Sequence, residues 1–105
     1  MNAMMVCGWY AYEAVLAGLM AASAGGRTWL GRSGMAAAVI AVYLLFAQLD
    51  VVATGPAWFI GGNIAVLVAG VAGLVFARRS DTRQIALLLA ASAAVPVALS
   101  YIRLP

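Results

Sequence analysis

A glutamate in the middle of an apolar, alanine- and glycine-rich stretch is the residue of this chain most able to do chemistry. Glu13 lies within residues 3–24, which contain no other charged side chain. An ionisable group at membrane depth is costly and marks a functional site by default. The other acids, Asp50 and Asp81, lie at the edges of apolar segments, where water can reach them. Glu13 is therefore the starting point for function.

Aromatic and small side chains share the helical face of Glu13. Trp9 and Tyr10 come one turn before it and Ala17 one turn after it. Because ring faces attract positive charge, this face suits a cation with hydrophobic substituents. A carboxyl group there can hold a proton or a cation but not both, which would couple their movements. The alternatives are an interfacial aromatic belt for the rings and, for Glu13, a neutral hydrogen-bonded acid between helices or a partner of an arginine in another subunit.

Polar and aromatic residues of later apolar segments complete the candidate pocket. Tyr43, Trp58 and Asn63 are placed there by the sequence pattern. Gly61 and Gly62, directly before Asn63, weaken the helical hydrogen-bond ladder and are predicted to form a hinge. The Asn63 amide suits a hydrogen bond to a substrate, although bonding between helices is the commoner use of such a residue.

The composition indicates an integral membrane protein. Of the 105 residues, 67% are hydrophobic and 9% charged, and the mean hydropathy is +1.06. A soluble domain of this size buries only about 60–70% of the surface its unfolded chain exposes, too little to hide so much apolar area. We therefore expect the lipid bilayer to surround the protein.

Cofactor chemistry and nucleic-acid binding are not expected. The chain has one cysteine, Cys7, and no histidine, so neither an internal disulfide nor an imidazole metal or haem ligand is available. Its basic side chains are six arginines placed between apolar segments, as expected of loop anchors. The sequence thus predicts no cofactor, no metal site and no enzymatic activity.

Hydropathy predicts an all-α membrane protein, a single domain of four transmembrane helices in an up-down bundle with short loops. The expected helices are residues 3–24, 33–49, 56–77 and 85–102. Short connections make sequence neighbours antiparallel, and Pro56 suits a first helical turn. Ala22-Ser23-Ala24 resembles a signal-peptidase site, but no basic residue precedes the apolar run and Glu13 interrupts it, so we expect this segment to remain as the first helix.

The arginines predict one orientation. Five of the six, Arg27, Arg32, Arg78, Arg79 and Arg83, lie in or beside the first and third loops. The positive-inside rule then places these loops in the cytoplasm and both termini outside.

Small residues at four-residue spacing predict close packing of the last two helices. They are Ala65, Ala69, Gly73 and Ala77 in the third, and Ala86, Ala90, Ala94 and Ala98 in the fourth. Pro96 removes a backbone hydrogen bond from the fourth helix, and neighbouring groups must satisfy the carbonyl that it frees.

Together these features resemble the small multidrug resistance transporters of bacteria, within the drug/metabolite transporter superfamily. Those proteins are similarly short, with four helices and an essential glutamate midway along the first. The matching residues are Glu13, Leu19-Met20, Ser23, Gly25, Tyr43-Leu44-Leu45, Gln48, Thr54-Gly55, Ala57-Trp58 and Asp81. The resemblance covers most of the first 60 residues.

The chain departs from the family pattern at three places. Ala21 stands near a position that is usually lysine, and Gly61-Gly62-Asn63 with Trp58 replaces a tryptophan followed by Gly-x-Gly. The fourth helix has alanines and Pro96 where the family has glycine in its dimerisation region.

The resemblance implies a bacterial inner-membrane dimer of oppositely inserted subunits that exports hydrophobic organic cations, of quaternary ammonium or guanidinium type, in exchange for protons. The partner would be a second copy or, given the arginine bias, an oppositely oriented paralogue. The alternatives are a non-catalytic accessory subunit of a larger membrane complex, a lipid-carrier flippase subunit and a holin-like pore.

Overall fold

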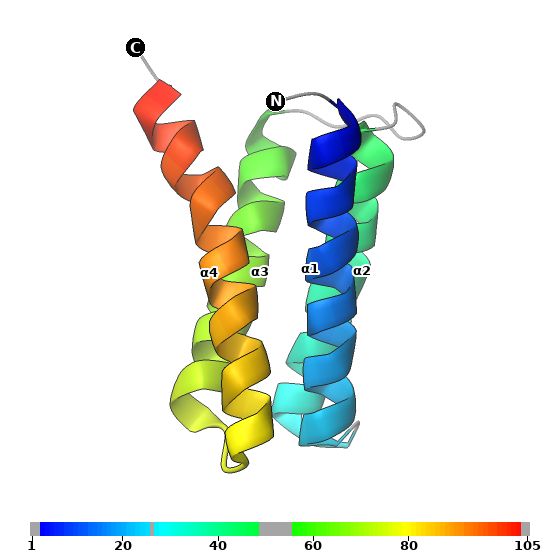
Figure 1. The fold of residues 1–105 in the computed structure, drawn as a ribbon, viewed down its shortest axis with the longest axis vertical. Coiled ribbons are helices and arrows are strands. Elements are labelled where there is room, and N and C mark those ends of the chain that lie inside the picture. Colours follow the sequence, from blue (N-terminus) through cyan, green and yellow to red (C-terminus); the bar gives the residue numbers. More distant parts are fainter. Residues whose placement is uncertain (1–2, 26, 49–55, 104–105) are drawn as a thin grey trace.

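The computed structural model describes residues 3–25, 27–48 and 56–103, and they form an up-down bundle of four helices (Figure 1). The helices are α1 (Ala3–Ala24), α2 (Trp29–Gln48), α3 (Pro56–Phe76) and α4 (Ser80–Arg103). The described part of the chain contains no strand. The predicted all-α fold is therefore confirmed, whereas Asp50, Thr54 and Gly55 lie outside the described residues.

All four helices are long and apolar enough to cross a membrane. The bundle is 39 Å along its longest axis, compared with about 30 Å for the hydrocarbon core of a bilayer. Large apolar side chains cover the outer faces, among them Val15, Val39, Val68 and Leu87. Such a surface is stable in lipid and not in water, so the protein is a multi-pass membrane protein.

Two helices begin earlier than hydropathy indicates, α2 at Trp29 and α4 at Ser80. Thr28 caps α2, because its Oγ1 accepts a hydrogen bond from the Gly31 amide at 3.0 Å. In α4 the Arg83 amide donates to the Arg79 carbonyl at 3.1 Å, which closes the first turn. The first turn of α4 is polar, and Arg32 and Ser33 separate Trp29 and Leu30 from the continuous apolar run of α2, so the expected helices began too late.

Each helical hairpin has a glycine that lets the two backbones approach closely. A β-carbon at Gly34 in α2 would lie 2.9 Å from the Ala21 amide nitrogen of α1, and one at Gly70 in α3 would lie 2.7 Å from the Ala90 nitrogen of α4. Real β-carbons do not approach backbone atoms so closely. The α1–α2 and α3–α4 pairs therefore depend on the missing side chains of these glycines.

The core contains small and medium-sized side chains from all four helices. Within the expected small-residue stripes, Ala69, Gly73, Ala77, Ala86 and Ala90 are buried, which agrees with their predicted packing role. Toward the C-terminus of α4 the stripe is less buried: Ala94 is half-buried and Ala98 is exposed. The core cluster consists of Leu16, Ala17, Met20, Ala37, Val66, Ala69, Ala86, Leu89 and Ala93.

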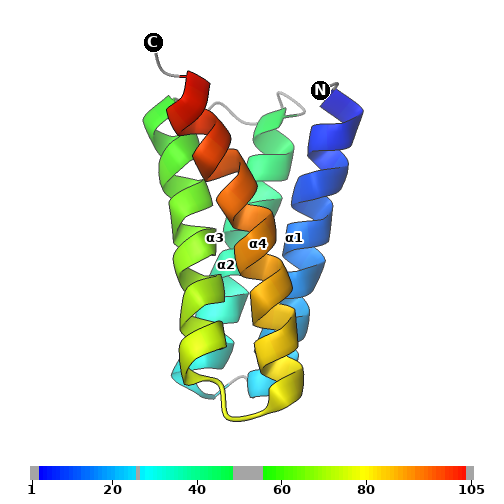
Figure 2. The ribbon, with the colours of Figure 1, turned by 60° about the vertical axis from the view of Figure 1, so that its left-hand side comes forward.

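The two predicted weak points in the helices behave differently. α3 continues without interruption through Gly61 and Gly62. α4 contains Pro96, and its C-terminal part leans away from α1 in both views of the ribbon (Figures 1 and 2). A proline in a helix interior removes a hydrogen bond and clashes with the preceding turn, which explains the lean.

Candidate functional site

Glu13 lies midway along α1 and is completely buried, with 0% of its surface exposed. Tyr10 and Ala17, one turn away on either side, are buried as well. Their common face points into the bundle because α1 packs against both α2 and α4. The acid singled out by the sequence is thus the buried acid of the described chain.

One oxygen of Glu13 is held by Trp9, which also reaches a second helix. The Trp9 indole Nε1 donates to Glu13 Oε1 at 3.1 Å and to the backbone carbonyl of Ser92 in α4 at 3.0 Å. One N–H thereby joins the carboxyl group to a different helix. Trp9 itself is 36% exposed, so its ring lies at the edge of the bundle.

The Ser92 carbonyl is the group that Pro96 leaves without its helical donor. In an α-helix the carbonyl of residue 92 accepts from the amide of residue 96, and proline has no amide hydrogen. The Trp9 indole supplies a replacement donor across the α1–α4 interface. One indole N–H therefore satisfies the carbonyl that Pro96 frees and also holds the Glu13 carboxyl group.

Tyr10 and Asn63 form a second buried contact, between α1 and α3. Asn63 Nδ2 donates to Tyr10 Oη at 3.3 Å and to the Phe59 carbonyl at 3.0 Å. The Tyr10 and Phe59 rings meet edge to face, with centroids 5.9 Å apart. Both amide hydrogens of Asn63 are used within the protein, which fixes its side chain.

Two buried oxygens remain without hydrogen-bond partners among the described residues. They are Glu13 Oε2 and Asn63 Oδ1. Buried polar atoms are almost always paired, so orphaned acceptors of this kind call for a donor that the chain does not supply. A proton on the carboxyl group, or a ligand with N–H groups, would provide one.

The remaining predicted residues lie at different places in the bundle. Trp58 is 75% exposed, on the outside of α3, and Tyr43 is half-buried in α2. Gly61 faces outward with open space around it, whereas a β-carbon at Gly62 would lie 3.2 Å from Leu44 Cδ2. Ala17 packs against Gly34, since a β-carbon there would lie 3.0 Å from the Ala17 carbonyl oxygen.

The Ser92 carbonyl is the contact that residue types alone did not identify. Its signal was the position of Pro96, which defines the freed carbonyl four residues earlier. Only the packing of α1 on α4 shows which donor replaces the lost one.

No basic side chain is bonded to Glu13 in the described structure. The ion pair of the described residues lies elsewhere, at the start of α4, where Arg79 and Asp81 are 3.5 Å apart and both side chains are about two-thirds exposed. Nor do the described residues contain a group of three side chains suited to a metal ion.

Comparison with protein-family models, curated proteins and solved structures found no match to this chain.

The bond between Trp9 and the Ser92 carbonyl predicts a coupling between two substitutions. Trp9→Phe should lower the free energy of unfolding by about 1–3 kcal/mol, because it leaves that carbonyl unpaired in an apolar setting. In a Pro96→Ala background the restored amide satisfies the carbonyl, so the same change should cost less. Reversible unfolding in mixed detergent micelles would measure both losses.

Trp29→Phe is the matched control, because the described structure shows no hydrogen bond from the Trp29 indole, which instead meets the Phe76 ring. Equal losses for Trp9→Phe in both backgrounds would contradict the proposed role of the indole.

Proposed function

We propose that this chain is a subunit of a proton-coupled exporter of small organic cations, with Glu13 as the exchange site. The observation that carries this proposal is the buried carboxyl group with one oxygen fixed by Trp9 and the other unpartnered. A structural acid would be expected to satisfy both oxygens, since orphaned buried acceptors are costly. An exchange site needs one oxygen available to its alternating occupants.

The two occupants would compete for the same oxygen. A proton on Glu13 Oε2 makes the group neutral, and a cation takes its place beside the ionised form. Ammonium and guanidinium groups bring N–H donors that suit Glu13 Oε2 and Asn63 Oδ1. A quaternary ammonium has none and would depend on charge and on the Trp9 and Tyr10 rings.

A second subunit belongs to this proposal. Trp58 and the exposed part of Trp9 present aromatic surface outside the four-helix bundle. A partner that covers them would bring Trp58 into the pocket predicted from the sequence. The arginine-rich loops lie together at one end (Figure 1). This bias favours a fixed orientation in a bacterial inner membrane with these loops in the cytoplasm, and hence an oppositely biased paralogue over a second copy.

The alternative function is that of a non-catalytic accessory subunit, and one observation favours it. Glu13 is enclosed by its own chain and shares the Trp9 indole with α4. In that case the carboxyl group would be a fixed link between helices, with no exchange of protons or cations.

Proton release on cation binding separates the two functions. The purified protein, in detergent and weak buffer near neutral pH, would be titrated with guanidinium, a primary alkylammonium and tetraphenylphosphonium. Exchange at Glu13 predicts the release of up to about one proton per chain. Asp81→Asn should release the same amount, because Asp81 is exposed at the arginine-rich end.

Absence of release with every cation of the panel would reject the exchange site and favour the accessory subunit.

A further inference from the structure

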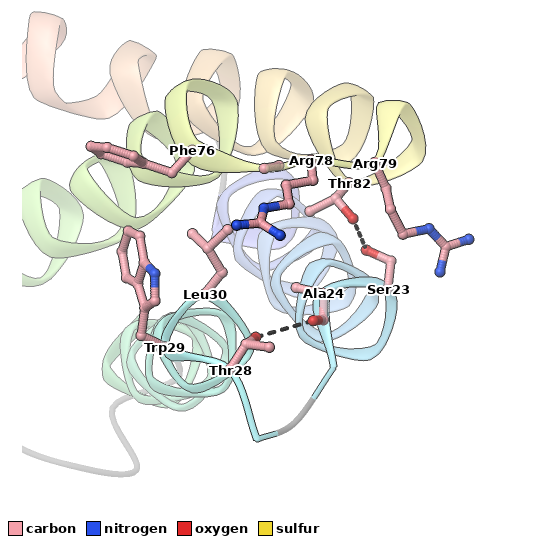
Figure 3. A pocket seen from close by; sticks show the side chains of 10 residues that line it. Ser23, Ala24, Thr28, Trp29, Leu30, Phe76, Arg78, Arg79 and Thr82 are labelled. Atoms are coloured by element: carbon pink, nitrogen blue, oxygen red, sulfur yellow. Dashed lines mark hydrogen bonds between the residues drawn. The ribbon is translucent and has the colours of Figure 1, made fainter.

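A second candidate site lies at the arginine-rich end of the bundle, away from Glu13. A pocket of about 420 Å³ opens where the turn between α1 and α2 meets the turn between α3 and α4 (Figure 3). All four helices contribute to its walls. The lining includes Ser23, Thr28, Trp29, Phe76, Arg78 and Thr82.

The hydroxyl groups of this pocket are already engaged within the protein. Ser23 Oγ donates to the Met20 carbonyl at 3.1 Å and lies 2.8 Å from Thr82 Oγ1. Thr28 Oγ1 lies within 3.0 Å of the carbonyls of Ala24 and Gly25 and accepts from the Gly31 amide. A neutral ligand that needs hydrogen bonds from hydroxyl groups would therefore find few available in this pocket.

The donors still available are the indole N–H of Trp29 and, in greater number, the N–H groups of Arg78. Both Arg78 and Arg79 line the pocket, and in Figure 3 the Arg78 guanidinium lies between the other lining side chains whereas the Arg79 side chain points outward. Arg79 pairs with Asp81. Arg78 has no hydrogen bond or ion pair with any residue that the structure describes. A guanidinium presents five N–H groups in a fork that matches the oxygens of phosphate.

The charge around the pocket selects an anion. Arg27, Arg32 and Arg83 lie at the same end of the bundle as Arg78 and Arg79, and Asp81 is the acid among them. The local balance is strongly positive even after the Arg79–Asp81 pair is counted. An anion here would meet a favourable field before it contacts any side chain.

Two exposed aromatic rings beside this pocket suit the depth of the lipid headgroups. Trp29 and Phe76 meet edge to face with centroids 5.4 Å apart, and both are largely exposed. Tryptophan is enriched at membrane–water interfaces. Basic pockets between transmembrane helices on the cytoplasmic side commonly bind anionic headgroups.

We propose that this pocket binds a phosphate ester, with Arg78 as its main ligand. The ester can come from an anionic phospholipid headgroup or from a soluble metabolite, since the recognised group is the same. The apolar wall formed by Leu30, Trp29 and Phe76 would contact the carbon atoms attached to the phosphate.

The test measures binding of two probes to the intact protein. Retention of phosphatidylglycerol would be followed by native mass spectrometry from micelles, with phosphatidylcholine as the reference lipid. Competition by sn-glycerol 3-phosphate would be measured in the same titration. We expect phosphatidylglycerol to bind preferentially and Arg78→Gln to weaken it about tenfold or more, because a charge-assisted fork is lost.

Arg32→Gln is the matched control. It removes the same charge from the same end, but Arg32 is not among the residues that line the pocket. We expect a loss of less than about twofold, because solvent and salt screen an exposed charge that does not contact the ligand. Both residues are exposed, so helicity measured by circular dichroism should be unchanged in each variant.

The outcomes separate the two sources of phosphate. Phosphatidylglycerol binding without competition by glycerol phosphate assigns the pocket to lipid, and competition at millimolar concentration assigns it to a soluble ester. Equal losses for Arg78→Gln and Arg32→Gln would overturn the proposal, because the charge of the whole surface would then explain the binding. Failure of both probes to bind would also overturn it.

Discussion

Glu13→Gln is expected to abolish cation transport and cation-induced proton release while the protein remains folded. Glutamine matches glutamate in shape and keeps an oxygen that can accept from Trp9 Nε1, as Glu13 Oε1 does at 3.1 Å. It can neither lose a proton nor bear a negative charge. The free energy of unfolding should stay within about 1 kcal/mol of the wild-type value, because the bond to Trp9 is kept.

Two measurements on one preparation would test this prediction. Cation-driven proton movement in proteoliposomes with an imposed pH gradient reports transport, and unfolding in mixed micelles reports stability. Asp81→Asn controls for the loss of a negative charge at an exposed position. Transport that persists in Glu13→Gln would contradict the assignment of Glu13 as the exchange site. Loss of folding would instead support the accessory-subunit function, in which the acid links helices.

Hydropathy was sufficient to predict the architecture of this chain. Four long apolar segments have few ways to satisfy their backbone groups in lipid other than as helices, and short loops make neighbouring helices antiparallel. The first residues of the helices were harder to predict from the sequence. Thr28 caps α2 through its hydroxyl group, and this cap lies in a polar stretch where apolar periodicity carries no information.

In the candidate site, too, the residue types could be recognised from the sequence, whereas the contacts between helices could not. Glu13, Tyr10 and Asn63 were recognisable because polar groups stand out in apolar helices, and all three are buried. The Trp9 bond to the Ser92 carbonyl depends on how α1 meets α4. Trp58 was assigned to the pocket from its residue type, but it faces outward in this chain.

Helix packing was predicted in outline, and the small-residue spacing identified one of the two closest α3–α4 contacts but not the other. The expected stripes rest on four-residue spacing, and several of their members are buried. Two α3–α4 approaches are equally close. A β-carbon at Gly73, within the expected stripe, would lie 2.7 Å from Ala86 Cβ, and one at Gly70, next to Ala69 and outside the stripe, would lie 2.7 Å from the Ala90 nitrogen. A spacing rule finds small residues that recur, whereas a single crossing point needs only one glycine.

Gly70→Leu is expected to separate α3 from α4 and to destabilise the bundle. A β-carbon at this position would lie 2.7 Å from the Ala90 nitrogen and 2.9 Å from its α-carbon. Both atoms belong to the backbone, so no side-chain rotation relieves the overlap and one helix must move. We expect a loss of about 2–4 kcal/mol in the free energy of unfolding, at the upper end of overpacking effects.

Gly61→Leu in the same helix is the matched control, because a β-carbon at Gly61 has no atom within 4 Å. It introduces the same side chain and the same gain in helix propensity, but on an outward-facing surface. Unfolding in mixed micelles should therefore show little loss for Gly61→Leu and a large one for Gly70→Leu. Similar stabilities for the two variants would mean that α3 and α4 do not pack as closely as the Gly70–Ala90 contact requires.

Gly61→Leu also tests the predicted hinge. A Gly61→Leu protein that is stable but transports poorly would indicate that this glycine is needed for a movement of α3, because its packing would be unchanged.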